Sequence, residues 1–179
     1  FSFIIIKQNR IWFDNKSLFV YAASMSPNSA WARSNLAAVY LNDKNFDKAK
    51  EEVEASLRIY RFNPSALNIL GKLYWEKGKH KEAEVAFKEA IEADISDRNS
   101  RRLYRILALL NLDLGNNQKA FMYMKKAVEL PAVQGSEKII KTDEILYQIV
   151  EDYKDRKLSS YTQKEGEDLA KLIKMVRGF

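Results

Sequence analysis

The sequence contains no cysteine, a single histidine, and few residues that break helices. Of its 179 residues, 6 are glycine and 3 are proline. Without cysteine the chain can form neither disulfides nor the usual zinc–thiolate sites. The scarcity of glycine and proline disfavours a β-rich fold, which needs many tight turns. Low-complexity stretches are also missing. The length of the chain fits one domain or a short repeat array.

Patterns that carry catalysis or metal chemistry are missing as well. His80 lies at an expected turn and has no cysteine or second histidine with which to share a metal ion. Residues 78–81 (GKHK) lack the spacing of a phosphate-binding loop. Glutamates such as Glu82 and Glu84 are spaced to pair with lysines on a solvated helix face. We therefore predict that the chain is not an enzyme and carries no catalytic residue, no metal site and no cofactor.

The charge balance is basic, with 30 lysine and arginine residues against 24 aspartate and glutamate residues and a formal net charge of +6. Such a balance can suit nucleic acid or an anionic membrane surface. The charges are scattered, however, as is typical of solvated helix faces. Base stacking would require exposed aromatic residues, and we expect Tyr40, Tyr74 and Phe87 to be needed for packing. Nucleic-acid binding is therefore the weaker alternative, and no specific nucleic acid is expected as a partner.

The sequence does contain an internal repeat. The pair Leu36 and Tyr40 recurs 34 residues later as Leu70 and Tyr74, and Ala83 likewise follows Ala49 by 34 residues. A third copy is shifted by 37 residues, and its three extra residues fit in the connection around 97–99. A regular period of this length indicates stacked helix pairs, each of which is too small to bury its apolar face alone.

The repeat resembles the tetratricopeptide repeat, whose signature runs Leu-Gly-x-x-Tyr, then Ala-x-x-x-Phe, then Ala. The second copy carries nearly all of it: Leu67, Leu70, Gly71, Tyr74, Gly78, Ala83, Phe87 and Ala90. The first copy has Val53 for the aromatic residue, and the third has Asn111 for the tyrosine. The resemblance covers about residues 12–131. It implies an all-α fold, a right-handed α-α superhelix of three to four helix pairs, that serves as a protein- or peptide-binding scaffold.

The repeat also predicts the domain organisation. The expected units are residues 12–27, which are incomplete, 30–63, 64–97 and 101–131. Residues 137–179 form either a degenerate repeat or a capping helix pair. The expected helices are Ser17–Met25, Ser29–Asn42, Phe46–Tyr60, Ser65–Lys77, His80–Ala93, Ser100–Leu114, Asn117–Leu130, Glu137–Arg156 and a last one that ends at Val176. If this last helix leaves the stack open, self-association is expected.

The N-terminal residues 1–11 leave two interpretations open. Their apolar run, FSFIII, is far shorter than the roughly 20 apolar residues that span a bilayer. It is followed by Trp12 and the repeats, which is similar to multipass membrane glycosyltransferases with C-terminal tetratricopeptide repeats. That resemblance implies an extracytoplasmic accessory domain with a membrane anchor upstream of Phe1. The alternative is an ordinary packed helix of a truncated first repeat in a cytoplasmic protein.

The resemblance implies a ligand groove lined by the first helices of successive units. We predict contacts at positions of these helices that packing does not use: Trp31, Asn35, Asn68, Lys72, Trp75, Arg102 and Arg105. An exposed tryptophan suits a protein contact, the cations suit an acidic peptide, and Asn68 could bond a peptide backbone. The arginines could instead pair with Asp97 and Asp113.

Overall fold

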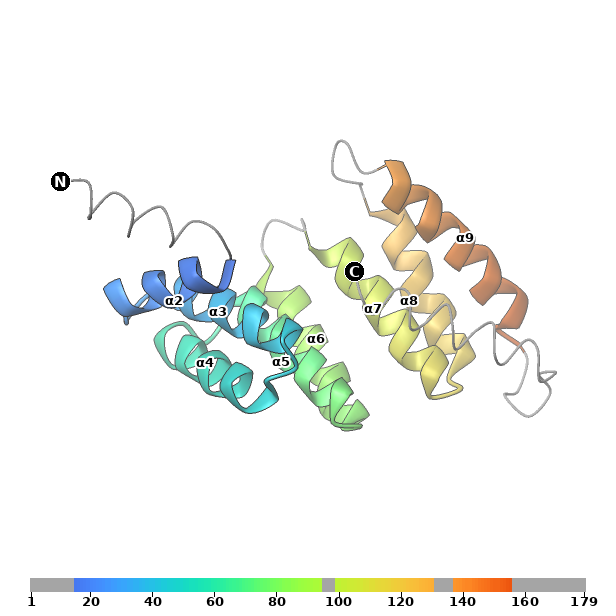
Figure 1. Cartoon of the computed structure of the whole chain (residues 1–179). Coiled ribbons are helices and arrows are strands. Elements are labelled where there is room, and N and C mark those ends of the chain that lie inside the picture. The colour runs from blue at the N-terminus through green and yellow to red at the C-terminus, as the bar shows by residue number, and fades with distance from the viewer. Residues whose placement is uncertain (1–14, 95–98, 131–136, 156–179) are drawn as a thin grey trace. The chain divides into compact units, whose positions relative to one another are not determined.

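The computed structural model describes residues 15–94, 99–130 and 137–155, and these ranges contain helices and no strand. The helices are α2 (Asn15–Met25), α3 (Ala30–Asn42), α4 (Phe46–Ile59), α5 (Pro64–Glu76), α6 (His80–Ala93), α7 (Ser100–Asp113), α8 (Asn117–Glu129) and α9 (Glu137–Tyr153) (Figure 1). The chain is therefore an all-α helical repeat, as predicted. The expected segment 1–11 and the expected helix that ends at Val176 lie outside the described residues.

Helices α3, α4 and α5 begin where short polar side chains cap them. Ser29 Oγ accepts a hydrogen bond from the amide of Ala32 at 3.2 Å, at the start of α3. Asn63 Oδ1 accepts one from the amide of Ser65 at 3.1 Å, at the start of α5, where Pro64 occupies the first turn. These caps satisfy amides that have no partner inside the helix. They explain why the predicted starts lie close to the observed ones.

The turns inside the helix pairs share one backbone conformation. Lys44, Gly78 and Gly115 have φ values of 57°, 71° and 72°. In each turn the following amide donates across the helix end, from Asn45 N to Tyr40 O, Lys79 N to Tyr74 O and Asn116 N to Asn111 O, each at 2.8 Å. A left-handed residue that closes such a bond is a common helix ending. The period seen in the sequence is therefore also a period of backbone hydrogen bonds.

The chain divides into two compact units, Phe1–Ala93 and Asp94–Phe179. In the first unit, α3 packs on α2, α4 and α5, while α5 packs on α4 and α6. Its core includes Ala37, Ala49, Val53, Ile69 and Leu73. Close approach of α5 and α6 depends on Gly71, because a Cβ there would lie 2.6 Å from two ring carbons of Phe87. The signature glycine and phenylalanine thus form one contact.

In the second unit, α8 packs on both α7 and α9. Its buried residues include Leu107, Leu110, Met124, Leu146 and Val150. Asn111, which replaces the signature tyrosine, is 0% exposed, and its Nδ2 donates to Leu107 O at 2.9 Å. No described helix of either unit has the length and apolar character needed to cross a membrane.

Candidate functional site

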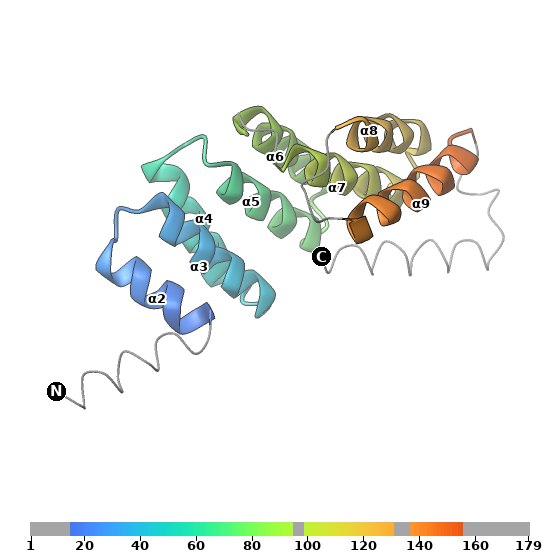
Figure 2. The same ribbon diagram turned by 90° about the horizontal axis from the view of Figure 1, so that it is seen from above.

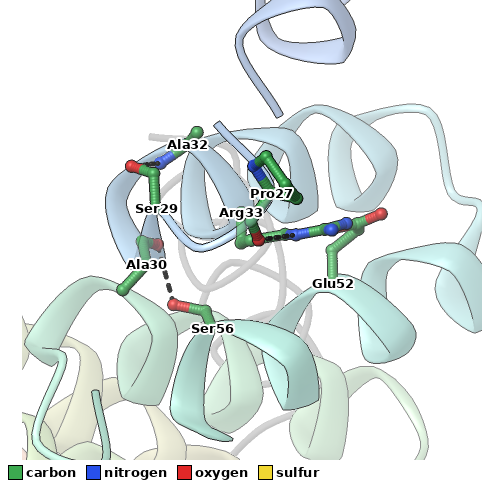
Figure 3. A network of polar contacts seen from close by, with 7 residues as sticks. All are labelled: Pro27, Ser29, Ala30, Ala32, Arg33, Glu52 and Ser56. Carbon is green, nitrogen blue, oxygen red and sulfur yellow. Dashed lines mark hydrogen bonds and ion pairs between the residues drawn. The ribbon is translucent and has the colours of Figure 1, made fainter. Parts of the chain in front are cut away.

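The predicted contact residues of the first unit lie on α3 and α5, which are neighbours in this unit (Figure 2). A polar network fixes the start of α3 against α4 (Figure 3). Ser56 Oγ donates to Ala30 O at 2.8 Å, and Asn63 Nδ2 donates to Ser56 Oγ at 2.9 Å. Arg33 pairs with Glu52 at 2.8 Å and also donates to Pro27 O. The start of α3 is therefore bonded both to α4, through Ser56 and Glu52, and to the connection that precedes α3, through Pro27.

Trp31 is the most exposed of the predicted contact residues on α3. Its side chain is 63% exposed, although its ring meets Phe19 of α2 edge to face, with centroids 5.7 Å apart. Asn35 is half-buried, and its Nδ2 donates to Trp31 O at 2.8 Å. The contact with Phe19 already restricts the rotation of the Trp31 side chain. Binding of a partner would therefore cost little additional side-chain entropy.

The residues of α5 lie deeper than the sequence predicted. Trp75 is 6% exposed and packs edge to face on Phe87, with centroids 6.4 Å apart. The prediction that Trp75 is exposed is therefore wrong. Asn68 is also 6% exposed, and Lys72 is half-buried. Within the described residues, Asn68 Oδ1 has no hydrogen-bond partner. A buried carbonyl oxygen without a donor is costly.

The arginines predicted on α7 differ from each other. Arg105 is 5% exposed and pairs with Asp143 of α9 at 2.8 Å, so it is neither solvated nor placed for a ligand. Arg102 is exposed at the surface. Although its surface is accessible, the surrounding protein partly desolvates the Arg102 guanidinium, and this desolvation and, second, the charge of Arg105 lower the pKa of Arg102 from its ordinary value. Arginine nevertheless stays protonated at neutral pH, so Arg102 offers a cation to an acidic group.

Sequence reasoning missed the pairing of α7 with α9. Asp143 is 0% exposed and accepts hydrogen bonds from Arg101 Nε at 2.7 Å and Arg105 Nη1 at 2.8 Å. Arg101 Nη1 also donates to Leu130 O at 2.7 Å. We call Arg101, Arg105 and Asp143 the α7–α9 ion cluster. Asp143 lies beyond the point where the repeat period ends, so no spacing rule pointed to it.

The face formed by α3 and α5 has little negative charge. Helix α3 contains no aspartate or glutamate, and the only acidic residue of α5 is its last residue, Glu76. Trp31 and Lys72 are thus accessible at least in part on helices that carry almost no acid. Such a face suits a partner with apolar and acidic groups.

A separate pocket of about 370 Å³ lies on α5 and α6, and none of the predicted contact residues lines it. Its lining includes Leu70 and Tyr74 together with the charged residues Lys81, Glu82 and Glu89. The mixed charges favour no ligand class. His80 is half-buried, and in the part of the chain that the structure describes no group of three metal-ligating side chains occurs.

Two models of the tetratricopeptide repeat match the sequence, over residues 28–96 and 70–136. No curated protein matches it. A solved structure of pilF from Pseudomonas aeruginosa is similar, with a TM-score of 0.61 and 20% identity over 88% of this chain. The chain spans 65% of the length of that structure. This likeness supports the all-α repeat fold.

Proposed function

Because this chain belongs to the tetratricopeptide repeat family, whose members are scaffolds for protein–protein interactions, we propose that it holds a protein or peptide along α3 and α5. The observation that carries the proposal is the near absence of acidic residues on these two helices beside the 63% exposed Trp31. Trp31 is the apolar anchor of this contact, and Lys72 is its cation. The partner is an extended or helical peptide with apolar and acidic side chains.

Asn68 supports the same proposal. Its buried Oδ1 accepts no hydrogen bond within the described residues, and an extended peptide carries a backbone N–H at every non-proline residue. That oxygen has almost no accessible surface, so a peptide N–H reaches it only if the Asn68 side chain turns outward in the complex. The bond would then remove the cost of the unpaired oxygen. Of the residues that the sequence singled out, Trp31, Asn35, Asn68 and Lys72 remain in this proposed site. Trp75 packs in the core beneath α5 and does not contact the ligand in this proposal. Arg105 does not take part in the site either.

The test is to select binders from a phage-displayed random peptide library on the whole chain and to measure their affinity by calorimetry. We expect acidic, apolar peptides that bind at least roughly tenfold more weakly to the W31A/K72E variant, because exposed anchors dominate such contacts. The matched control is M122A/K119E, which also removes one exposed apolar side chain and reverses one lysine. Selected peptides that bind both variants equally well would contradict the proposal.

A second candidate is an accessory role beside a membrane-embedded glycosyltransferase-like enzyme, with no catalysis in this chain. The apolar run FSFIII ahead of Trp12 favours it. In this case an antibody to the domain should detect a large species that stays in the membrane pellet after an alkaline carbonate wash. A small species released by the wash would refute this second candidate and leave the peptide-binding proposal untouched.

A further inference from the structure

Exposed apolar side chains gather where successive helix pairs of the first unit are joined. Met25 ends α2 and is 65% exposed, while Ile59 ends α4 and is 42% exposed. Tyr60 and Phe62 follow in the α4–α5 connection and are 50% and 59% exposed. Met25 and Ile59 are 34 residues apart and therefore occupy equivalent places in successive repeats.

The two connections lie at the same end of the helices (Figure 2). Hydrogen bonds tie them together, since Ser56 Oγ in the last turn of α4 and Asn63 Nδ2 just before α5 both donate to Ala30 O at the start of α3. We call Met25, Arg58, Ile59, Tyr60, Arg61 and Phe62 the connection edge. Trp31 is excluded from it because it belongs to the proposed peptide site.

The charge of the connection edge has one sign. Residues 15–42 and 55–75 contain no aspartate or glutamate. Arg58 and Arg61 are exposed, and the Arg61 guanidinium lies 5.7 Å from the centre of the Phe62 ring. The acidic residue nearest in the polar network, Glu52, is already paired with Arg33. The edge therefore presents exposed aromatic and aliphatic tips beside two arginines, and the carboxylate of Glu54, one turn before Arg58 on α4, is paired with Lys50 at 3.5 Å.

We propose that the connection edge docks on the surface of an anionic lipid bilayer. Aromatic side chains with a polar end favour the headgroup region, and aliphatic tips such as Met25 and Ile59 can enter the acyl boundary. Each arginine near an anionic surface contributes attraction that falls off within a Debye length. This inference goes beyond the proposed peptide site, which uses other residues.

Other occupants fit the connection edge less well. A second copy of this chain joined by two-fold symmetry would bring the arginines of both edges together, and like charges at an interface are unfavourable. A peptide that lies along a repeat array contacts the faces of helices, whereas these side chains protrude from helix ends and a connection. Nucleic-acid bases stack on aromatic rings, which leaves Met25 and Ile59 without a role. A bilayer uses the protruding apolar tips and the arginines together.

The absence of cysteine makes the first test direct. A single cysteine is introduced at Phe62 or, as control, at Val85, which is 55% exposed on α6, and each is labelled with an environment-sensitive fluorophore. With vesicles that contain about one-third phosphatidylserine, we expect a blue shift at position 62 and none at 85. Equal shifts at both positions, no shift at 62, or an equal shift with phosphatidylcholine vesicles would each overturn the proposal.

The second test measures vesicle co-sedimentation of charge variants. R58E/R61E should weaken binding to phosphatidylserine vesicles by roughly tenfold or more, because two basic contacts are reversed. K81E/K119E makes the same change in net charge at exposed lysines elsewhere and should have a much smaller effect. Equal losses would show only a general charge effect and refute the proposal. W31A/K72E should keep vesicle binding, so failure of the peptide site is distinguishable from failure of the edge.

Discussion

Gly71 illustrates how one missing Cβ shapes the contact between two helices. A Cβ at this position would lie 2.6 Å from Cδ1 and Cε1 of Phe87, a separation that real Cβ contacts do not show. Phe87 is 0% exposed, so its ring cannot swing out into solvent. Either α5 and α6 would move apart or the ring would leave its preferred rotamer.

We predict that Gly71→Ala destabilises the fold by about 1–3 kcal/mol, the usual cost of overpacking a core. This outcome is opposite to the gain of about 1 kcal/mol expected for glycine-to-alanine changes inside exposed helices. Urea denaturation followed by circular dichroism measures it. A pair of substitutions, Gly71→Ala with Phe87→Leu, should recover part of the loss. A Gly71→Ala variant as stable as the parent would contradict this prediction and show that the Phe87 ring can move aside without cost.

The same residues show what sequence can and cannot predict. Gly71 and Phe87 were identified as members of the tetratricopeptide signature in the second copy, and the structure shows that they are in contact. Trp75 was predicted to be exposed because it follows the packing residue Tyr74, yet it is 6% exposed. Periodicity gives the direction of a side chain on its own helix, whereas burial also depends on how closely a neighbouring helix approaches.

Helix α9 is attached to α7 by buried charges. Asp143 is 0% exposed, and both of its carboxylate oxygens accept hydrogen bonds from arginines of α7. Losing one member of a buried ion cluster leaves the remaining charges without compensation. The sequence predicted the extent of α9 from its apolar face but not this attachment, because a partner pair 42 residues apart, Arg101 and Asp143, follows no repeat spacing.

We therefore predict that Asp143→Asn destabilises the second unit by about 3 kcal/mol, since two arginines lose their counter-charge. Amide hydrogen exchange should rise most strongly in α9. The control is Asp152→Asn on the exposed face of α9, which should change stability by less than about 0.5 kcal/mol. If both substitutions cost the same, the α7–α9 ion cluster does not hold the helix.

For the whole molecule, the main feature is its division into two compact units, Phe1–Ala93 and Asp94–Phe179. In repeat proteins, stability is carried by each unit and its nearest neighbours. Gly71 contacts Phe87 in the first unit, and Asp143 contacts arginines in the second. The expected subdivision of residues 12–131 into four units stays a prediction, because both ends of this range lie outside the described residues.

This division predicts that the two substitutions act independently. Gly71→Ala should raise amide exchange in α5 and α6 and leave α8 and α9 unchanged, and Asp143→Asn should do the reverse. The double variant should equal the sum of the single variants within about 0.5 kcal/mol. Hydrogen exchange measured by mass spectrometry resolves both units in one experiment. Loss of protection that spreads from one unit into the other would contradict independence.

The turns inside the helix pairs have a consequence for the chirality of the amino acids that they accept. At Lys44, Gly78 and Gly115 the backbone has positive φ, which L-residues other than glycine rarely adopt. The mirror-image amino acids favour this region for the same steric reason. A chemically synthesised chain with D-alanine at position 78 would therefore restrict the unfolded state without straining the folded one. The turns at positions 44, 78 and 115, which are 34 and 37 residues apart, are thus the places where a chain of L-amino acids would accept a D-amino acid.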